Sequence, residues 1–78
     1  MTLIELITAE AGRLKTAGVS FGHGTGNAFD EAAWLVLWAL GLPLEALEPN
    51  AKRMLTEDEA ARATALVGER IATRKPAA

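Results

Sequence analysis

Residues 32–40, Ala-Ala-Trp-Leu-Val-Leu-Trp-Ala-Leu, decide the fold, because all nine are apolar. A helix that is hydrophobic on every side lies inside a protein rather than on its surface. Asn27 supplies an N-cap before this run, and Gly41 follows where a helix would stop. We therefore predict a central helix up to residue 40 that is too short to span a membrane, since about 13 residues cover about 20 Å.

The two tryptophans of this run, Trp34 and Trp38, are four residues apart and share one face of the predicted helix. Their apolar surroundings favour burial in the core. The alternative is an exposed stripe that binds a partner, because tryptophan is enriched at the centres of protein interfaces.

An amphipathic helix precedes the central one. Thr2 and Glu5 form a capping-box pattern, in which each side chain satisfies a backbone amide at the start of a helix. Gly18 supplies the left-handed backbone conformation with which helices often end. These signals predict a helix over residues 3–17. Its apolar face is formed by Leu3, Ile4, Ile7, Ala11 and Leu14.

A third long helix follows a second capping box, formed by Thr56 and Glu59. Acidic residues at its start and basic residues at its end match the helix dipole, and Pro76 ends it. A stripe with helical spacing, flanked by Leu66, runs along it through Ala60, Ala63, Val67, Ile71 and Arg74. We expect Arg70, Arg74 and Lys75 to form a solvated basic end.

Two prolines bound the segment between the second and third long helices. Pro43 and Pro49 permit one short helical turn, from which we expect Leu44 and Leu47 to point inward. A further short turn is expected over residues 50–54. No stretch alternates apolar and polar residues over the length of a strand. The sequence therefore predicts an all-α fold, a small antiparallel helical bundle of three longer helices plus one or two short ones.

The composition excludes several classes of function. The 78 residues are 50% hydrophobic and 23% charged, which indicates a folded chain with one modest core. With no cysteine and one histidine, neither a disulfide nor a cysteine- or histidine-based metal site is expected. A net charge of -2 argues against a nucleic-acid module, including a degenerate helix-turn-helix DNA binder. The cytoplasm is the expected location, since the sequence has neither a secretory signal nor a membrane span.

The glycine-rich segment 22–26 precedes the central helix and is similar to a phosphate-binding loop. Such a loop needs a buried strand before it, and residues 17–21 are too short and too broken to form one. We interpret the segment as a tight connection between helices. His23 is the single histidine of a chain without cysteine, so we interpret it as a hydrogen-bonding loop residue rather than a general base or a metal ligand. Asp30 and Glu31 are interpreted as caps that complement the helix dipole.

Four stretches carry a resemblance to a known family. They are residues 21–32 (FGHGTGNAFDEA), 42–49 (LPLEALEP), 55–56 (LT) and 69–78 (ERIATRKPAA). Together they resemble the N-terminal region of the PrmB branch of the HemK-type protein-glutamine methyltransferases, over nearly the whole chain. Gly26 departs from the pattern, because this branch is expected to have Asp there.

The resemblance implies an excised domain of a larger enzyme. In the family, a helical N-terminal domain precedes a Rossmann-like domain that binds S-adenosylmethionine and methylates a glutamine side chain, using an Asn-Pro-Pro-Tyr motif that this chain lacks. No catalytic, cofactor-binding or metal residue is therefore implied here, and no binding of S-adenosylmethionine by the chain itself. Residues 1–74 are implied to be a helical substrate-recognition domain, and residues 75–78 the start of a linker.

The implied partners are a protein substrate, which for this branch is protein three of the large ribosomal subunit, and the parent's own catalytic domain. Neither nucleic acid nor a membrane is a predicted partner. The alternative is a free-standing helical interaction module whose apolar groove takes a partner helix. The candidate partner-contact residues come from the glycine-rich segment and the basic helix end: Phe21, Gly22, His23, Gly24, Thr25, Asn27, Arg70 and Arg74.

Overall fold

A computed structural model describes residues 1–18 and 27–73. The elements in these ranges are α1 (Leu3–Ala17), α2 (Ala28–Ala39), the 3-10 turn η1 (Leu44–Ala46), α3 (Leu47–Asn50) and α4 (Glu57–Thr73). Three long and two short helical elements confirm the predicted all-α fold.

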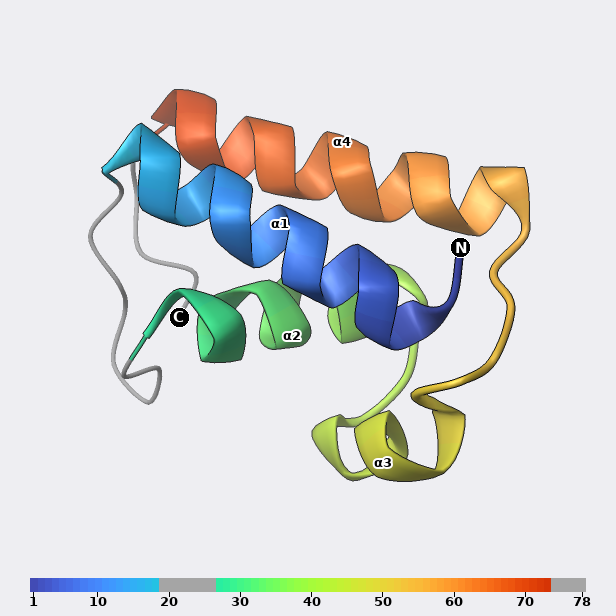
Figure 1. The fold of residues 1–78 in the computed structure, drawn as a ribbon. Helices are drawn as coiled ribbons and strands as arrows, with labels where there is room; N and C mark the ends of the chain where they lie inside the picture. The colour runs from blue at the N-terminus through green and yellow to red at the C-terminus, as the bar shows by residue number, and fades with distance from the viewer. Residues whose placement is uncertain (19–26, 74–78) are drawn as a thin grey trace.

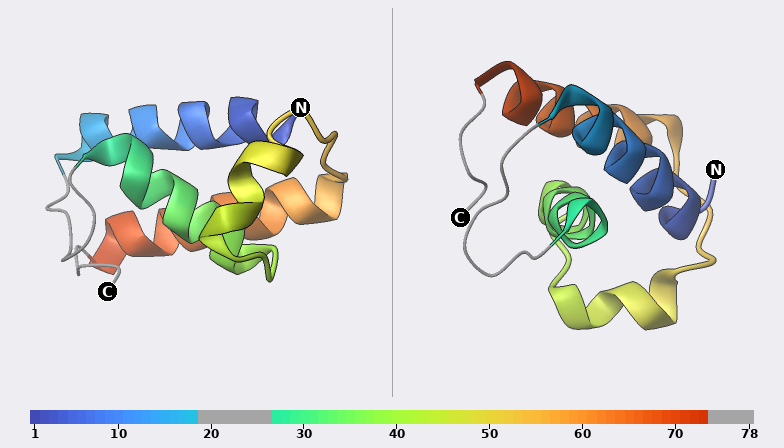
Figure 2. Two further views of the ribbon diagram at one scale, coloured as in Figure 1. Left: turned by 90° about the horizontal axis from the view of Figure 1, so that it is seen from below. Right: turned by 60° about the vertical axis from the view of Figure 1, so that its left-hand side comes forward.

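The three long helices form the body of the molecule. Helices α1 and α4 lie side by side, and α2 packs against both of them (Figure 1). Figure 2 shows α2 nearly end-on beside the layer that α1 and α4 form. The chain directions alternate, because α1 and α4 run one way and α2 runs the other. The short elements lie to one side, where η1 contacts α2 and α3 contacts α1.

The core lies where the three long helices meet. Its buried apolar residues are Leu3, Leu6, Ile7, Leu14, Ala32, Ala33, Leu35, Val36, Leu37, Ala63 and Val67. Five of these eleven residues belong to α2, which confirms it as the central helix. Full burial of one large aliphatic side chain contributes about 1.5–3 kcal/mol, so this cluster is the main source of stability.

The first four backbone amides of α1 are all paired. The Leu3 amide donates to the carbonyl oxygen of Arg53 at 3.0 Å, and the Ile4 amide donates to that of Ala51 at 2.9 Å. Thr2 accepts from the next two amides, with its hydroxyl at 3.3 Å and its carbonyl at 3.0 Å. Helix starts otherwise leave such amides unsatisfied. The predicted capping box is thereby confirmed, and the segment before α4 is fixed against the start of α1.

Local signals place the ends of α1 and α2 where the sequence predicts them. Gly18 has a φ of 68° and caps the end of α1, which confirms residues 3–17 as a helix. The Asn27 side chain accepts a hydrogen bond from the amide of Asp30 at 2.9 Å, as expected of an N-cap. Gly41 has a φ of 71° just beyond α2, a conformation that glycine adopts without a steric penalty.

Three expectations for residues 32–49 are wrong. Trp38 is 63% exposed, because α1 and α4 cover only one side of α2. Leu44 is 54% exposed. The leucines of this segment that pack against the core are Leu42 and Leu47. Helix α3 runs through Pro49, which is possible because a proline in the first turn of a helix lacks only an amide that would have no helical partner.

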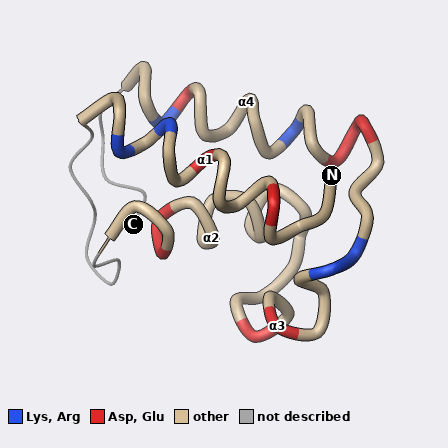
Figure 3. The backbone as a smooth tube through the Cα atoms, viewed as in Figure 1, with Lys and Arg blue, Asp and Glu red and all other residues tan. Residues whose placement is uncertain are grey.

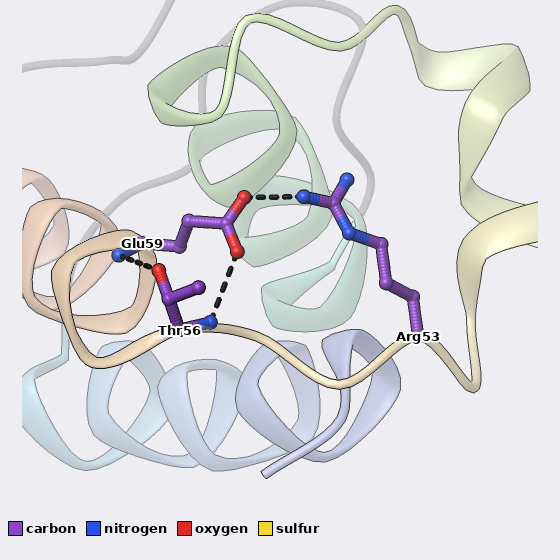
Figure 4. A network of polar contacts seen from close by, with 3 residues as sticks. All are labelled: Arg53, Thr56 and Glu59. Carbon is purple, nitrogen blue, oxygen red and sulfur yellow. Dashed lines mark hydrogen bonds and ion pairs between the residues drawn. The ribbon is translucent and has the colours of Figure 1, made fainter.

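Helix α4 begins with a capping box that also includes a charge pair (Figure 4). The Thr56 amide donates to Glu59 Oε1 at 3.0 Å, and the Glu59 amide donates to Thr56 Oγ1 at 3.1 Å. The Arg53 guanidinium pairs with the other carboxylate oxygen of Glu59. The hydrogen bond from the Thr56 amide and the nearby Arg53 charge hold the pKa of Glu59 below its ordinary value of 4.5, although partial desolvation opposes them. The corresponding bonds from Thr2 lower the pKa of Glu5 at the start of α1.

These caps predict how stability depends on pH. Folding favours the charged form of Glu59, so its contribution to the free energy of unfolding is complete above pH 4.5 and is lost as the pH falls through its lower folded-state pKa. We expect Glu59→Gln to destabilise the domain at pH 7 and to make its stability fall less steeply below pH 4.5. Urea unfolding at several pH values from 7 to about 3 measures both effects. Glu57→Gln, in the same first turn but outside the capping box, is the control, and equal pH profiles for the two variants would contradict the prediction.

Candidate functional site

The structure describes two of the eight candidate contact residues, Asn27 and Arg70. Residues 21–25 and Arg74, six of the eight, lie outside the described ranges. Asn27 is exposed, and its side chain caps α2. Arg70 is buried. Of the predicted contact residues that are described, Asn27 alone lies on the surface.

Arg70 lies inside the bundle, so its predicted place in a solvated basic end is wrong. Its exposed fraction is 5%, and that of Glu31 on α2 is 0%. Arg70 Nε donates to Glu31 Oε2 at 2.8 Å. A buried charge is tolerated when an opposite charge is within hydrogen-bonding distance, and each residue supplies that partner for the other. Arg70 is therefore not a surface contact residue, and Glu31 is not merely an exposed helix cap.

The sequence contained a signal for this burial. Arg70 follows Ala63 by seven residues and Val67 by three, which places it on the same side of α4 as these two core residues. The charge of Arg70, in contrast, favours the solvent. The helical spacing was the better guide.

A second buried carboxylate, Glu10 on α1, pairs with an arginine of the same helix that contacts α4. Glu10 is 3% exposed and accepts a hydrogen bond from Arg13 at 2.6 Å. Arg13 also donates to the backbone carbonyl of Thr64 on α4 at 3.4 Å. Polar contacts thus join α2 to α4 through Arg70 and Glu31, and α1 to α4 through the hydrogen bond from Arg13 to Thr64.

Three helix ends lie at the same end of the bundle, which we call the exit end (Figure 1). They are the end of α1 at Gly18, the start of α2 at Asn27 and the end of α4 at Thr73. The ion pair between Arg70 and Glu31 lies about one helical turn from the last two of these positions. It therefore holds the last turn of α4 against the first turn of α2.

Helix α2 has an uncovered side, which we call the tryptophan face: Asp30, Trp34 and Trp38. These residues are four apart and lie on one side of the helix. Asp30 is exposed, Trp34 is partly buried and Trp38 is 63% exposed. The two indole rings are stacked, with centroids 6.1 Å apart and ring planes 6° apart. The structure thus supports the exposed stripe that the sequence left open, and the burial predicted for Trp38 is wrong.

Acidic residues gather away from the exit end, on the η1–α3 segment and at the start of α4 (Figure 3). Lys52 and Arg53 are the basic residues between these two groups. Acidic residues therefore outnumber basic ones on this part of the described surface.

Neither a metal cluster nor a membrane-spanning helix is found in residues 1–18 and 27–73. No three His, Asp or Glu side chains there are grouped so that they could hold a metal ion. No single helix there is long and apolar enough to cross a membrane, and α2 meets the criteria of length and composition only together with the η1–α3 segment, across a bend of 98°.

The described residues define a small all-α helical bundle, and comparisons with known proteins show what the chain is similar to. The chain is 43% identical to the ribosomal protein uL3 glutamine methyltransferase of Burkholderia pseudomallei, and 40% identical to proteins of the same name from Neisseria meningitidis serogroup B and Xanthomonas campestris. Each alignment includes 77 residues and covers 99% of this chain and 25% of the relative. No family model matches the chain, and no solved structure matches it significantly.

The chain thus spans about a quarter of the length of the curated relatives that it matches. The resemblance predicted from the sequence is confirmed, because the whole chain is similar at about 40% identity to proteins named uL3 glutamine methyltransferases and matches the N-terminal domain of such a protein.

The buried ion pair predicts a large effect of Arg70→Met on stability. The substitution leaves the Glu31 carboxylate in the interior without this cation, and breaking a buried pair in this way costs about 3–5 kcal/mol. We expect urea unfolding to show this loss in the free energy of unfolding, and to show that the double variant Glu31→Leu, Arg70→Met recovers part of it.

The control is Arg62→Met, which changes an exposed arginine of the same helix and should alter stability by about 0.5 kcal/mol or less. If Arg70→Met had no larger effect than this control, Arg70 would be solvated in solution and would return to the candidate contact surface.

Proposed function

We propose that this chain is the N-terminal domain of an S-adenosylmethionine-dependent protein-glutamine methyltransferase, and that it helps the enzyme to recognise its protein substrate. The observation that carries the proposal is an identity of about 40% to uL3 glutamine methyltransferases over 99% of the chain. The proposed substrate is ribosomal protein uL3. Residues 1–74 form the domain in this proposal, and residues 75–78 begin the linker to the catalytic domain that binds the methyl donor. The proposed location is the cytoplasm, because ribosomal proteins are synthesised there.

The proposed division of labour has a physical reason. An enzyme that methylates one glutamine among many gains specificity from contacts that are remote from the reacting amide, since remote binding energy stabilises the transition state of the correct substrate alone. A small domain without catalytic groups can supply such contacts.

The exit end is the proposed location of these contacts. The described chain leaves α4 there, at Thr73, so a catalytic domain that follows α4 is attached at this end. A substrate held beside Asn27 is then close to both domains. The proposed contact residues are accordingly residues 21–25, Asn27 and Arg74, whereas Arg70 serves the interior.

A free-standing interaction module is the second candidate function, and the exposure of Trp38 favours it. Exposed tryptophans are suited to any protein partner. The two candidates differ in one respect that can be measured, because only the first requires the domain to affect a methylation reaction.

In the full-length parent, deletion of residues 1–74 should lower kcat/KM for intact uL3 by about tenfold or more, which corresponds to about 1.4 kcal/mol of transition-state stabilisation. The affinity for S-adenosylmethionine should stay within about twofold, because the donor belongs to the catalytic domain. Steady-state methylation assays and calorimetric titration of the donor measure the two quantities. The single substitution Arg74→Glu should lower kcat/KM in the same direction while changing stability by about 0.5 kcal/mol or less.

An unchanged kcat/KM after deletion, with a catalytic domain that is still folded, would show that this domain is not the recognition element. A loss of donor affinity by the same factor as kcat/KM would show that its role is to support the catalytic domain structurally.

A further inference from the structure

The tryptophan face exposes a large aromatic side chain on the central helix of the bundle. Trp38 keeps 63% of its surface in water, although it lies on the helix that supplies five of the eleven core residues. Large exposed apolar side chains that share one face mark sites of interaction, and tryptophan is among the residues most enriched at the centres of interfaces.

The stacking of Trp34 on Trp38 prepares this face for binding. Their ring planes differ by 6° at a centroid distance of 6.1 Å, which lies in the range of favourable offset-stacked aromatic pairs. A partner that covers them pays little side-chain entropy, because a tryptophan side chain has only two rotatable bonds. Asp30, one turn before Trp34, places a negative charge at the rim of the apolar surface.

The length of the relatives indicates what covers the face. The 77 matched residues are 25% of the Burkholderia relative, so that protein has about 310 residues, of which about 230 lie outside the match. A folded body of about 230 residues has a radius of gyration of about 17 Å. A tethered body of this size is present at an effective concentration in the millimolar range, which favours it over a partner that must diffuse to the site.

The exit end brings such a body within reach of the tryptophan face. Thr73 is three residues beyond Arg70, and Trp34 is three residues beyond Glu31. Three residues of helix rise about 4.5 Å, and packed helices are about 8–10 Å apart. Because the ion pair at 2.8 Å fixes Arg70 to Glu31, the chain leaves α4 within about 20 Å of Trp34.

We propose that the tryptophan face docks against the catalytic domain of the parent enzyme and forms the interface between the two domains. This inference rests on the proposed function, since it requires the longer parent. The partner surface is apolar opposite Trp34 and Trp38 and carries a positive charge or a hydrogen-bond donor opposite Asp30. The Arg70–Glu31 pair is the positioning element, because it sets where the chain leaves α4 relative to this face.

The test compares the solvent exposure of Trp38 in the 78-residue chain and in the full-length parent. Both proteins are labelled with 5-fluorotryptophan, and the fluorine resonance of Trp38 is assigned as the one that disappears in Trp38→Phe. A soluble gadolinium chelate broadens the resonances of exposed groups. We expect the broadening of the Trp38 resonance to be at least threefold smaller in the parent. The control is the labelled methyl group of Met54, which is 66% exposed beside the start of α1, away from the exit end, and should be broadened equally in both proteins.

Equal broadening of the Trp38 resonance in the two proteins would overturn the proposal. Protection that appears only when uL3 is added would also overturn it, and would assign the face to the substrate. Protection that rises with the concentration of the 78-residue chain alone would assign it to a second copy. This readout involves no methylation, so loss of the recognition role in the deletion experiment and loss of the docking interface can be distinguished.

Discussion

Helix α2 has to bury one side between α1 and α4, and the other elements are arranged around that requirement. Its inner side contributes Leu35, Val36 and Leu37 to the core. Because only two long helices pack against it, an arc that contains Trp34 and Trp38 is left open. One apolar helix therefore contributes five of the eleven buried apolar residues and also leaves Trp38 exposed on its other side.

Charged pairs complete the packing of this small core. The pair between Glu31 and Arg70 joins the first turn of α2 to the last turn of α4, and the pair between Glu10 and Arg13 lies where α1 meets α4. A buried ion pair is weak evidence for net stability, because desolvation offsets much of the attraction. Its clearer consequence is geometric, since each charge has few positions in which it is satisfied. The pair therefore fixes the direction in which α4 leads out of the domain.

The ends of the helices could be predicted from short sequence signals. The burial of single side chains was harder to predict, because it depends on which other helices pack against them. The capping boxes at Thr2 and Thr56 and the glycine at the end of α1 depend on adjacent residues, so the sequence was sufficient to place them. Which side of an all-apolar helix stays open depends on how many helices cover it, and residues 32–40 contain no such information. Arg70 was misassigned because its charge was given more weight than its helical spacing. For the candidate site, the sequence predicted the relationship to glutamine methyltransferases, but six of the eight proposed contact residues lie outside the described ranges.

The division of α2 into an inner and an open side is the central claim, and the stability of Leu37→Ala relative to Trp38→Ala tests it most directly. Leu37 is 1% exposed, so its truncation should cost about 2–5 kcal/mol through lost burial and a residual cavity. Trp38 is 63% exposed, so removal of its much larger side chain should cost about 1 kcal/mol or less, chiefly through lost stacking on Trp34. Urea unfolding of the two variants gives both values. A cost for Trp38→Ala equal to or above that for Leu37→Ala would show that the tryptophan lies in the core, and would contradict this account.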